Sequence, residues 1–122
     1  MQRRTRQRDA IQAALREAGR PLSPAEILEA AQATVPSLGE ATVYRAIRSL
    51  LEEGWLTEVE LPGEASRYEL ADKEHHHHFH CRSCDRVYDL PGCPGSLDDL
   101  APRGFQVEEH EIILYGTCPD CG

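Results

Sequence analysis

Metal-ligand side chains are concentrated in residues 75–84, which read HHHHFHCRSC. Five of the six histidines and two of the five cysteines lie in this stretch. A second C-x-x-C pair lies near residue 120. Two such pairs suit a closed, tetrahedral Zn²⁺ site with four thiolates. We therefore predict structural zinc on Cys81, Cys84, Cys118 and Cys121, with a folded domain bringing the two pairs together.

Two other interpretations fit these residues less well. A histidine run is typical of an expression tag, but tags are normally terminal and this run leads directly into C-x-x-C. A single C-x-x-C pair can be a redox motif, whereas two pairs beside a histidine cluster favour metal binding.

The histidine run predicts ligands for more than one site. In an extended segment, successive side chains alternate between two faces. His75 and His77 then share one face, and His76 and His78 share the other. Two imidazoles on one face can converge on an ion at about 2.0–2.1 Å. One short strand can therefore serve two metal sites.

The composition indicates a small chain with an uneven distribution of charge. Its 122 residues suffice for one ordinary domain or two very small ones. The formal net charge is −8, yet residues 1–20 contain six arginines and two acidic residues. Residues 61–122 contain five basic and twelve acidic residues. This asymmetry predicts a basic arm and an acidic, metal-binding part, although acidic residues are by default a solvated surface.

No apolar run resembles a signal peptide or a membrane span. We therefore expect a soluble, cytoplasmic protein without a membrane partner. In that compartment, paired cysteines favour metal binding over disulfides.

Helical spacing of apolar residues predicts three helices, over residues 5–18, 23–33 and 37–53. The second and third begin at capping-box patterns, S-P-A-E at 23–26 and S-L-G-E at 37–40. Gly19 and Gly54 are expected to end the first and the third.

The predicted third helix has two different faces. Its buried face consists of Val43, Ala46, Ile47 and Leu50. Its opposite face consists of Ala41, Tyr44, Arg45 and Arg48. Such a face can contact bases and phosphates in a major groove, although many charged faces are simply solvated.

The predicted fold class is α+β. Alternating residues at 55–61, a turn at 62–65 and a strand at 66–70 predict a β-hairpin. Three helices and a hairpin predict a winged helix-turn-helix DNA-binding domain over residues 1–70. A hinge at 71–74 then leads to a small α/β zinc-containing dimerisation domain over residues 75–122.

In that second domain we expect strands at the histidine run and at 86–90, a turn at 91–95 and a short helix at 96–100. Residues 105–107 and 110–115 are expected to form a closing hairpin. The exposed edge of so small a sheet predicts a homodimer.

Several motifs occur in a fixed order along the chain. They are G-x-x-T-V-Y-R at 39–45, Y-E-L at 68–70, H-H-x-H-x-x-C-x-x-C at 75–84 and Y-G-x-C-x-x-C at 115–121. Together they resemble the ferric uptake regulator (Fur) superfamily over essentially the whole chain. The resemblance implies a metal-responsive transcriptional repressor, not an enzyme, that binds double-stranded DNA at a palindromic operator as a homodimer.

The resemblance also implies roles for individual residues. Structural zinc is expected on the four cysteines named above. A regulatory divalent ion, Zn²⁺, Fe²⁺ or Mn²⁺, is expected on Glu69, His76, His78 and Asp89. An additional site is expected on His75, His77, His110 and, from the predicted short helix, Asp98. The expected DNA contacts, including those from the exposed helix face, are Arg4, Arg8, Thr42, Tyr44, Arg45 and Arg48.

Departures from the family pattern leave the sensed metal open. Many iron and peroxide sensors have a histidine just before the second helix, where this chain has Arg20 and Pro21. Zinc sensors often have a cysteine in place of Glu69 and an aspartate or histidine in place of Thr57. The histidine run and the C-R-S-C pair are most similar to zinc-uptake regulators. Cys93 has no place in the family pattern. A free cysteine on such a turn is more often incidental than a ligand, but it lies four residues after Asp89, so assistance to the regulatory site stays open.

Two other functions are compatible with the ligands. One is zinc storage or metallochaperone activity, and the other is a small zinc enzyme with an open coordination position. The sequence contains no HExxH pattern and no Ser-His-Asp arrangement that would favour the enzyme.

Overall fold

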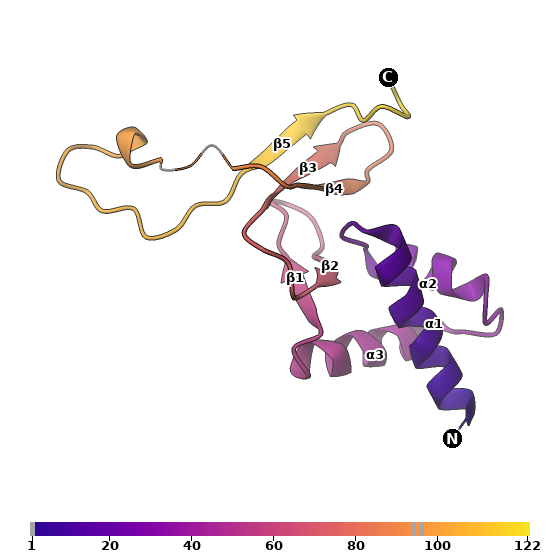
Figure 1. Cartoon of the computed structure of the whole chain (residues 1–122). Helices are drawn as coiled ribbons and strands as arrows, with labels where there is room; N and C mark the ends of the chain where they lie inside the picture. The colour runs from indigo at the N-terminus through magenta and orange to yellow at the C-terminus, as the bar shows by residue number, and fades with distance from the viewer. Residues whose placement is uncertain (1, 94, 96) are drawn as a thin grey trace. The chain divides into compact units, whose positions relative to one another are not determined.

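The computed structural model describes residues 2–93, 95 and 97–122, apart from the side chains of residues 2–4. It has the predicted α+β composition, in the order shown in Figure 1. The chain divides into two compact units, Met1–Lys73 and Glu74–Gly122, called the N-terminal and C-terminal units below. No helix among the described residues is both long and apolar enough to cross a membrane.

The N-terminal unit contains three helices and a two-stranded sheet. The helices are α1 (Gln2–Ala18), α2 (Pro24–Gln32) and α3 (Glu40–Glu52). The antiparallel strands are β1 (Leu56–Val59) and β2 (Arg67–Leu70). The three predicted helices and the hairpin are thus confirmed. Helix α1 begins before residue 5 because the preceding glutamine and arginines are themselves good helix formers.

The two capping-box predictions have different outcomes. At α2 the box forms: the Glu26 N–H donates to Ser23 Oγ at 3.1 Å, and the Ser23 N–H donates to Glu26 Oε1 at 2.9 Å. At α3 the prediction is wrong, because Gly39 is the N-cap and makes no side-chain cap. Leu38 is 2% exposed, so its burial in the core sets where the chain enters α3.

The core of the N-terminal unit is apolar and drawn from all three helices. Its largest fully buried side chains include Ile11, Leu15, Ile27, Val43 and Leu50. The predicted two-faced character of α3 is confirmed, since Val43, Ile47 and Leu50 are buried. Ala41, Tyr44, Arg45 and Arg48 are all exposed.

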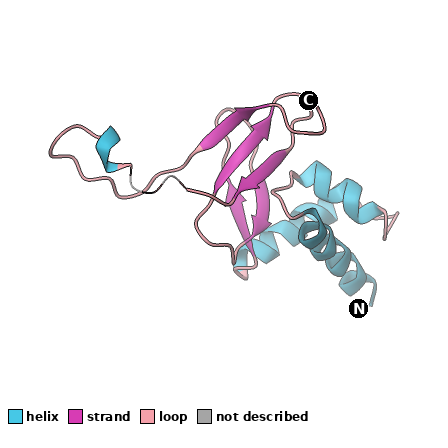
Figure 2. Ribbon diagram, turned by 45° about the horizontal axis from the view of Figure 1, so that its top comes forward, coloured by secondary structure: helices cyan, strands magenta, loops and turns pink. Residues whose placement is uncertain are grey.

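The C-terminal unit is built on a three-stranded sheet with the order β4-β3-β5. Its strands are β3 (His77–Cys81), β4 (Val87–Leu90) and β5 (Ile113–Gly116). Strand β3 is central, antiparallel to β4 and parallel to β5. The segment between β4 and β5, residues 91–112, contains only the 3₁₀ helix η1 (Asp98–Leu100) among its described residues (Figure 2).

The predicted closing hairpin is therefore wrong. Residues 105–107 are not in a strand, and β5 pairs with β3 in parallel instead. Cys81 is the last residue of β3, and the second C-x-x-C pair follows β5. Parallel strands end at the same edge of a sheet, so this pairing brings the two cysteine pairs together. Gly116 allows the close approach of Phe79, whose Cζ would lie 3.2 Å from a Cβ at this position.

Candidate metal centres

The four paired cysteines meet where the parallel strands β3 and β5 end. Their sulfur atoms all lie within 4.8 Å of one another, and Cys84 Sγ is 3.8 Å from Cys118 Sγ. Zn–S bonds of about 2.3 Å in a tetrahedron place sulfur atoms about 3.8 Å apart. The arrangement of Cys81, Cys84, Cys118 and Cys121 is that of a closed tetrahedral site.

The protein backbone prepares this group for a cation. Cys81 is fully buried, and the backbone N–H groups of Cys84 and Cys118 donate to its sulfur at 3.5 and 3.4 Å. These donors lower the pKa of Cys81 to about 6. The Cys121 thiol contacts the other sulfur atoms, first that of Cys118, and its pKa is raised to about 12. These four thiols would hold a divalent cation, which binds thiolate and so would favour the ionised form of all four.

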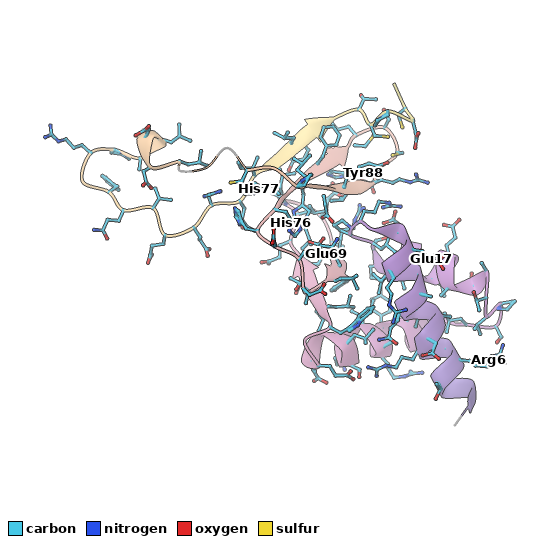
Figure 3. The ribbon with its side chains drawn as sticks, in the orientation of Figure 1. Arg6, Glu17, Glu69, His76, His77 and Tyr88 are labelled. Carbon is cyan, nitrogen blue, oxygen red and sulfur yellow. The ribbon has the colours of Figure 1, made fainter. Side chains whose placement is uncertain are left out.

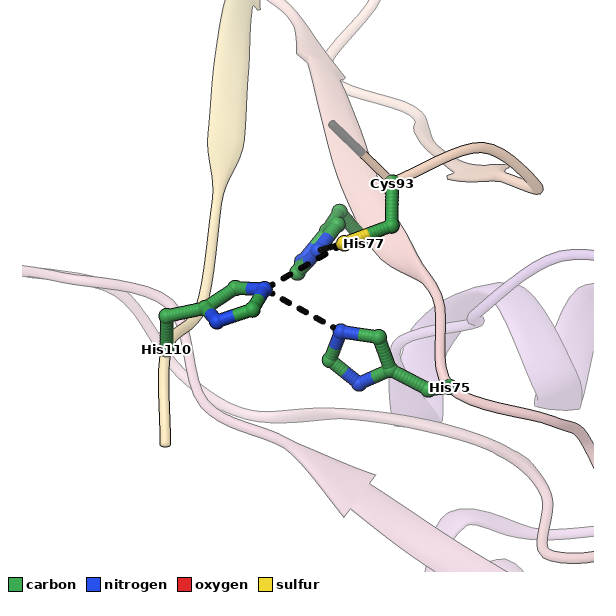
Figure 4. A group of neighbouring side chains, drawn as sticks. All are labelled: His75, His77, Cys93 and His110. Atoms are coloured by element: carbon green, nitrogen blue, oxygen red, sulfur yellow. Dashed lines mark hydrogen bonds between the residues drawn. The ribbon is translucent and has the colours of Figure 1, made fainter. Parts of the chain in front are cut away.

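A second group forms on one face of the histidine run (Figure 4). It consists of His75, His77, His110 and Cys93, whose ligand atoms all lie within 4.8 Å of one another. His75 Nε2 is 3.3 Å from His110 Nε2, and Cys93 Sγ is 3.3 Å from Nε2 of both His77 and His110. The three histidines predicted for the additional site are thus brought together.

The fourth member of this group is Cys93, not Asp98. Asp98 lies in η1, which stands away from the sheet in Figure 1, and it belongs to no such group among the described residues. Cys93 lies only three residues after the end of β4, which is paired with β3. It is therefore close to the histidines of β3 whatever path the rest of segment 91–112 takes. The geometry therefore places Cys93, and not the predicted Asp98, beside the three histidines. The sequence did contain one indication of this role: Cys93 is the single cysteine that does not belong to a C-x-x-C pair.

His77 is the most enclosed member of the second group, at 3% exposure. Burial, and then the neighbouring histidines, lower its pKa below the usual 6.5, which favours the neutral, metal-binding form. The backbone N–H of Ile112 donates to His77 Nδ1 at 3.2 Å. A metal held at Nε2 would require the ring proton on Nδ1, and this contact would then have to open.

A third group forms on the opposite face of the run. His76 Nε2 and His78 Nε2 lie 3.3 and 3.5 Å from the same carboxylate oxygen of Asp89, Oδ1. His78 and Asp89 are direct cross-strand partners in the β3–β4 ladder. His76 Nδ1 lies 2.7 Å from the Glu74 carbonyl oxygen, to which it donates, and this contact leaves Nε2 as the ring nitrogen that faces Asp89. His76 and His77 can be followed at the start of β3 in Figure 3.

Glu69, the fourth predicted regulatory ligand, belongs to the N-terminal unit. It is the third residue of β2, is 3% exposed and forms an ion pair with Lys73 Nζ at 3.1 Å. A carboxylate buried this deeply needs a cationic partner. Its joint coordination of an ion with the C-terminal unit stays a prediction.

The predicted DNA-contacting residues lie on α1 and α3. Tyr44 is 51% exposed, and Arg45 Nη2 donates to Thr42 Oγ1 at 3.2 Å. Arg8 donates to Ser49 Oγ at 3.4 Å and forms an ion pair with Glu53 at the end of α3.

Of the predicted DNA-contacting residues, Arg8, Thr42 and Arg45 border an open hollow of about 430 Å³ between the two helices. Arg48 is exposed on the same face as Tyr44. The side chain of Arg4 lies outside the described residues.

Known proteins resemble this chain in both sequence and structure. The ferric uptake regulator family model matches residues 2–115. Transcriptional regulator FurA of Mycobacterium bovis is 32% identical over 98 residues, which span 78% of this chain and 67% of FurA. The Helicobacter pylori ferric uptake regulator Fur superposes with a TM-score of 0.71 at 25% identity, over 94% of this chain and 79% of that one.

A further solved structure, FurB of M. tuberculosis, is described as a zinc uptake regulator. It is 30% identical, with a TM-score of 0.55, over 98% of this chain and 95% of that one. The match of the family model along nearly the whole chain agrees with the winged-helix order of elements and the cysteine pairs. This chain therefore belongs to the ferric uptake regulator family of metal-responsive transcriptional regulators.

Proposed function

We propose that this protein is a repressor that binds a palindromic operator as a homodimer in the cytoplasm, when its regulatory site holds a divalent ion. The observation that carries this proposal is the convergence of His76, His78 and Asp89 just after the junction of the two units. An ion held there and by Glu69 would connect the hairpin of the DNA-binding unit to the C-terminal unit.

Such an ion would work by selecting a conformation. Metal binds only neutral imidazole and ionised carboxylate, and it binds best where the ligands are already arranged. The ion would therefore favour the arrangement of units in which Glu69 meets the histidines. In a dimer, that arrangement would hold two recognition helices at a fixed half-site spacing.

The face of α3 supports the DNA-binding part of the proposal. Tyr44, Arg45 and Arg48 are exposed together on a helix whose other face is fully committed to the core. Arginine is the usual side chain for contacts to guanine and phosphate in a major groove. Arg8, anchored beside α3, would add a phosphate contact.

The C-terminal unit supports the dimer. Strand β5 is an edge of its sheet, and Leu114 and Tyr115 on it are 49% and 43% exposed. An edge strand with exposed apolar residues is a favourable surface for a second copy of the chain.

Zinc is the leading candidate for the sensed ion. Two histidines and two carboxylates can bind Zn²⁺, Fe²⁺ or Mn²⁺. The N-terminal unit has Arg20 and Pro21 just before α2, so no ligand is available there. The relative FurB, described as a zinc uptake regulator, matches nearly the whole of this chain.

The proposal is tested by comparing the two faces of the histidine run. DNA selected from a random pool at saturating Zn²⁺ provides the operator probe, and fluorescence anisotropy follows binding over a range of free Zn²⁺, Mn²⁺ and Fe²⁺. The double variant His76→Ala/His78→Ala should keep its structural zinc and its dimer but lose metal-dependent DNA binding. The matched variant His75→Ala/His77→Ala should retain most of it. A His76→Ala/His78→Ala protein that responds to metal like the unmodified chain would refute the assignment.

A further inference from the structure

We infer that Cys93 is the fourth ligand of a closed site with His75, His77 and His110, and that its sulfur makes this site selective for Zn²⁺ over Mn²⁺ and Fe²⁺. The inference concerns the metal-binding part of the proposed function and requires neither DNA binding nor a particular regulatory site.

The distances carry the geometric part of the argument. In a tetrahedral zinc site, bonds of about 2.0–2.1 Å to nitrogen and about 2.3 Å to sulfur place ligand atoms about 3.3–3.6 Å apart. The separations between His75 and His110, between His77 and Cys93, and between Cys93 and His110 are all 3.3 Å. Three of the six separations are therefore close to those of a tetrahedral zinc site, and all six are within 4.8 Å.

The four ligands come from three separate segments. His75 and His77 belong to the start of β3, Cys93 follows β4, and His110 precedes β5. Cys93 and His110 thus mark the two ends of the long segment between β4 and β5. An ion bound to both would hold the two ends of that segment together in the folded unit, and its binding free energy would add to the stability of that unit.

The chemistry of sulfur decides the preferred ion. A thiolate and a carboxylate carry the same charge, so exchanging one for the other leaves the net charge of a three-histidine site unchanged. Thiolate is the softer ligand and favours zinc, whereas carboxylate suits manganese and similarly hard ions. Four protein ligands also leave no open coordination position, which is typical of sites that hold zinc without catalysis.

Cys93 is also chemically available for this role. The four other cysteines form the group at the opposite end of β3, and Cys93 lies with the histidines. It is exposed, so an ion can enter and leave without unfolding of the unit.

The experiment uses Co²⁺ as a spectroscopic probe of the full chain with its structural zinc in place. A thiolate ligand produces a charge-transfer band in the near ultraviolet, which imidazole and carboxylate do not. The unmodified protein should show this band on adding Co²⁺. Cys93→Ser should lose the band and bind Co²⁺ at least about tenfold more weakly. Mutating a residue that only supports a ligand already lowers metal affinity about tenfold or more, and removing the ligand itself should lower it at least as much.

Two further variants sharpen the result. Cys93→Asp should restore Co²⁺ binding without the band and raise the affinity for Mn²⁺ relative to Zn²⁺. Asp98→Ala should behave like the unmodified chain. Zinc content is measured in parallel, so that Co²⁺ entering the four-cysteine site is recognised.

The inference is overturned if Cys93→Ser keeps the full band while retaining one zinc per chain, or if Asp98→Ala abolishes Co²⁺ binding. An independent readout is alkylation of Cys93, followed by mass spectrometry. Zn²⁺ should slow this alkylation at least about tenfold in the unmodified chain, and it should have no such effect in His75→Ala/His77→Ala. Equal alkylation of the unmodified chain with and without Zn²⁺ would also overturn it. Because no DNA is present, failure here is distinct from failure of the proposed repressor function.

Discussion

The two units of this protein are stabilised in different ways. Fifteen of the eighteen buried apolar side chains among the described residues lie in the N-terminal unit. The three in the C-terminal unit are Val87 and two of the paired cysteines, Cys81 and Cys118. A unit this small with so few buried apolar groups needs a metal or a partner to be stable. The comparison indicates that the C-terminal unit depends on a metal or a partner for its stability, whereas the N-terminal unit has an apolar core of its own.

The largest effect is expected from removing a buried thiol. Cys118→Ala should lose its tightly bound zinc and unfold the C-terminal unit, because a structural metal site contributes directly to folding. The helices of the N-terminal unit should persist. Zinc content and hydrogen exchange resolved by unit measure both effects. The four-cysteine assignment would be wrong if Cys118→Ala kept its zinc and its C-terminal protection.

A change in the apolar core should show the reverse pattern. Ile47 is 3% exposed in α3, so Ile47→Ala should destabilise the N-terminal unit by about 2–5 kcal/mol. Zinc content should stay unchanged. The control is Arg48→Ala, which alters the neighbouring exposed residue and should change stability by no more than about 0.5 kcal/mol. Hydrogen exchange of the helix amides measures both variants, and zinc loss in Ile47→Ala would contradict the separation of the two units.

A smaller effect is expected at the start of α2. Ser23→Ala removes one half of the capping box and should cost about 0.5–2 kcal/mol in the N-terminal unit. Ser37→Ala is the matched control, because Ser37 lies before Gly39, the actual N-cap of α3. Its effect should be close to zero by the same hydrogen-exchange measurement. Equal losses in the two variants would show that Ser37 has a role that the observed cap does not explain.

The smallest effect concerns the ion pair between α1 and α3. Arg8, by hydrogen bonding, lowers the pKa of Glu53 below the usual 4.5. The ion pair therefore stabilises the folded protein fully above about pH 4.5, the pKa of Glu53 in the unfolded chain. This stabilisation is lost as the pH falls through the lower pKa that Glu53 has in the folded protein. In Arg8→Ala, a titration of Glu53 followed by NMR should show its pKa returning toward 4.5. An unchanged titration would mean that Arg8 does not control this carboxylate in solution.

Local patterns in the sequence determined much of the N-terminal unit. Helical spacing identified α1, α2 and α3, and alternation identified the β1–β2 hairpin, because these elements depend on residues close together along the chain. The capping box at Ser23 was correct for the same reason. Each C-x-x-C pair is also a local pattern, so the cysteines could be named as candidate ligands before their arrangement was known.

Only the tertiary structure decided how distant segments of the C-terminal unit meet. Parallel pairing of β3 with β5 depends on a connection of more than twenty residues, and no local pattern specifies it. The same holds for Cys93 and His110, which become neighbours only once β4 and β5 flank β3. The sequence by itself therefore identified the residue types that bind metal. The strand pairing decided which of them lie close together, because a shared ion requires separations of a few ångströms between groups far apart in the chain.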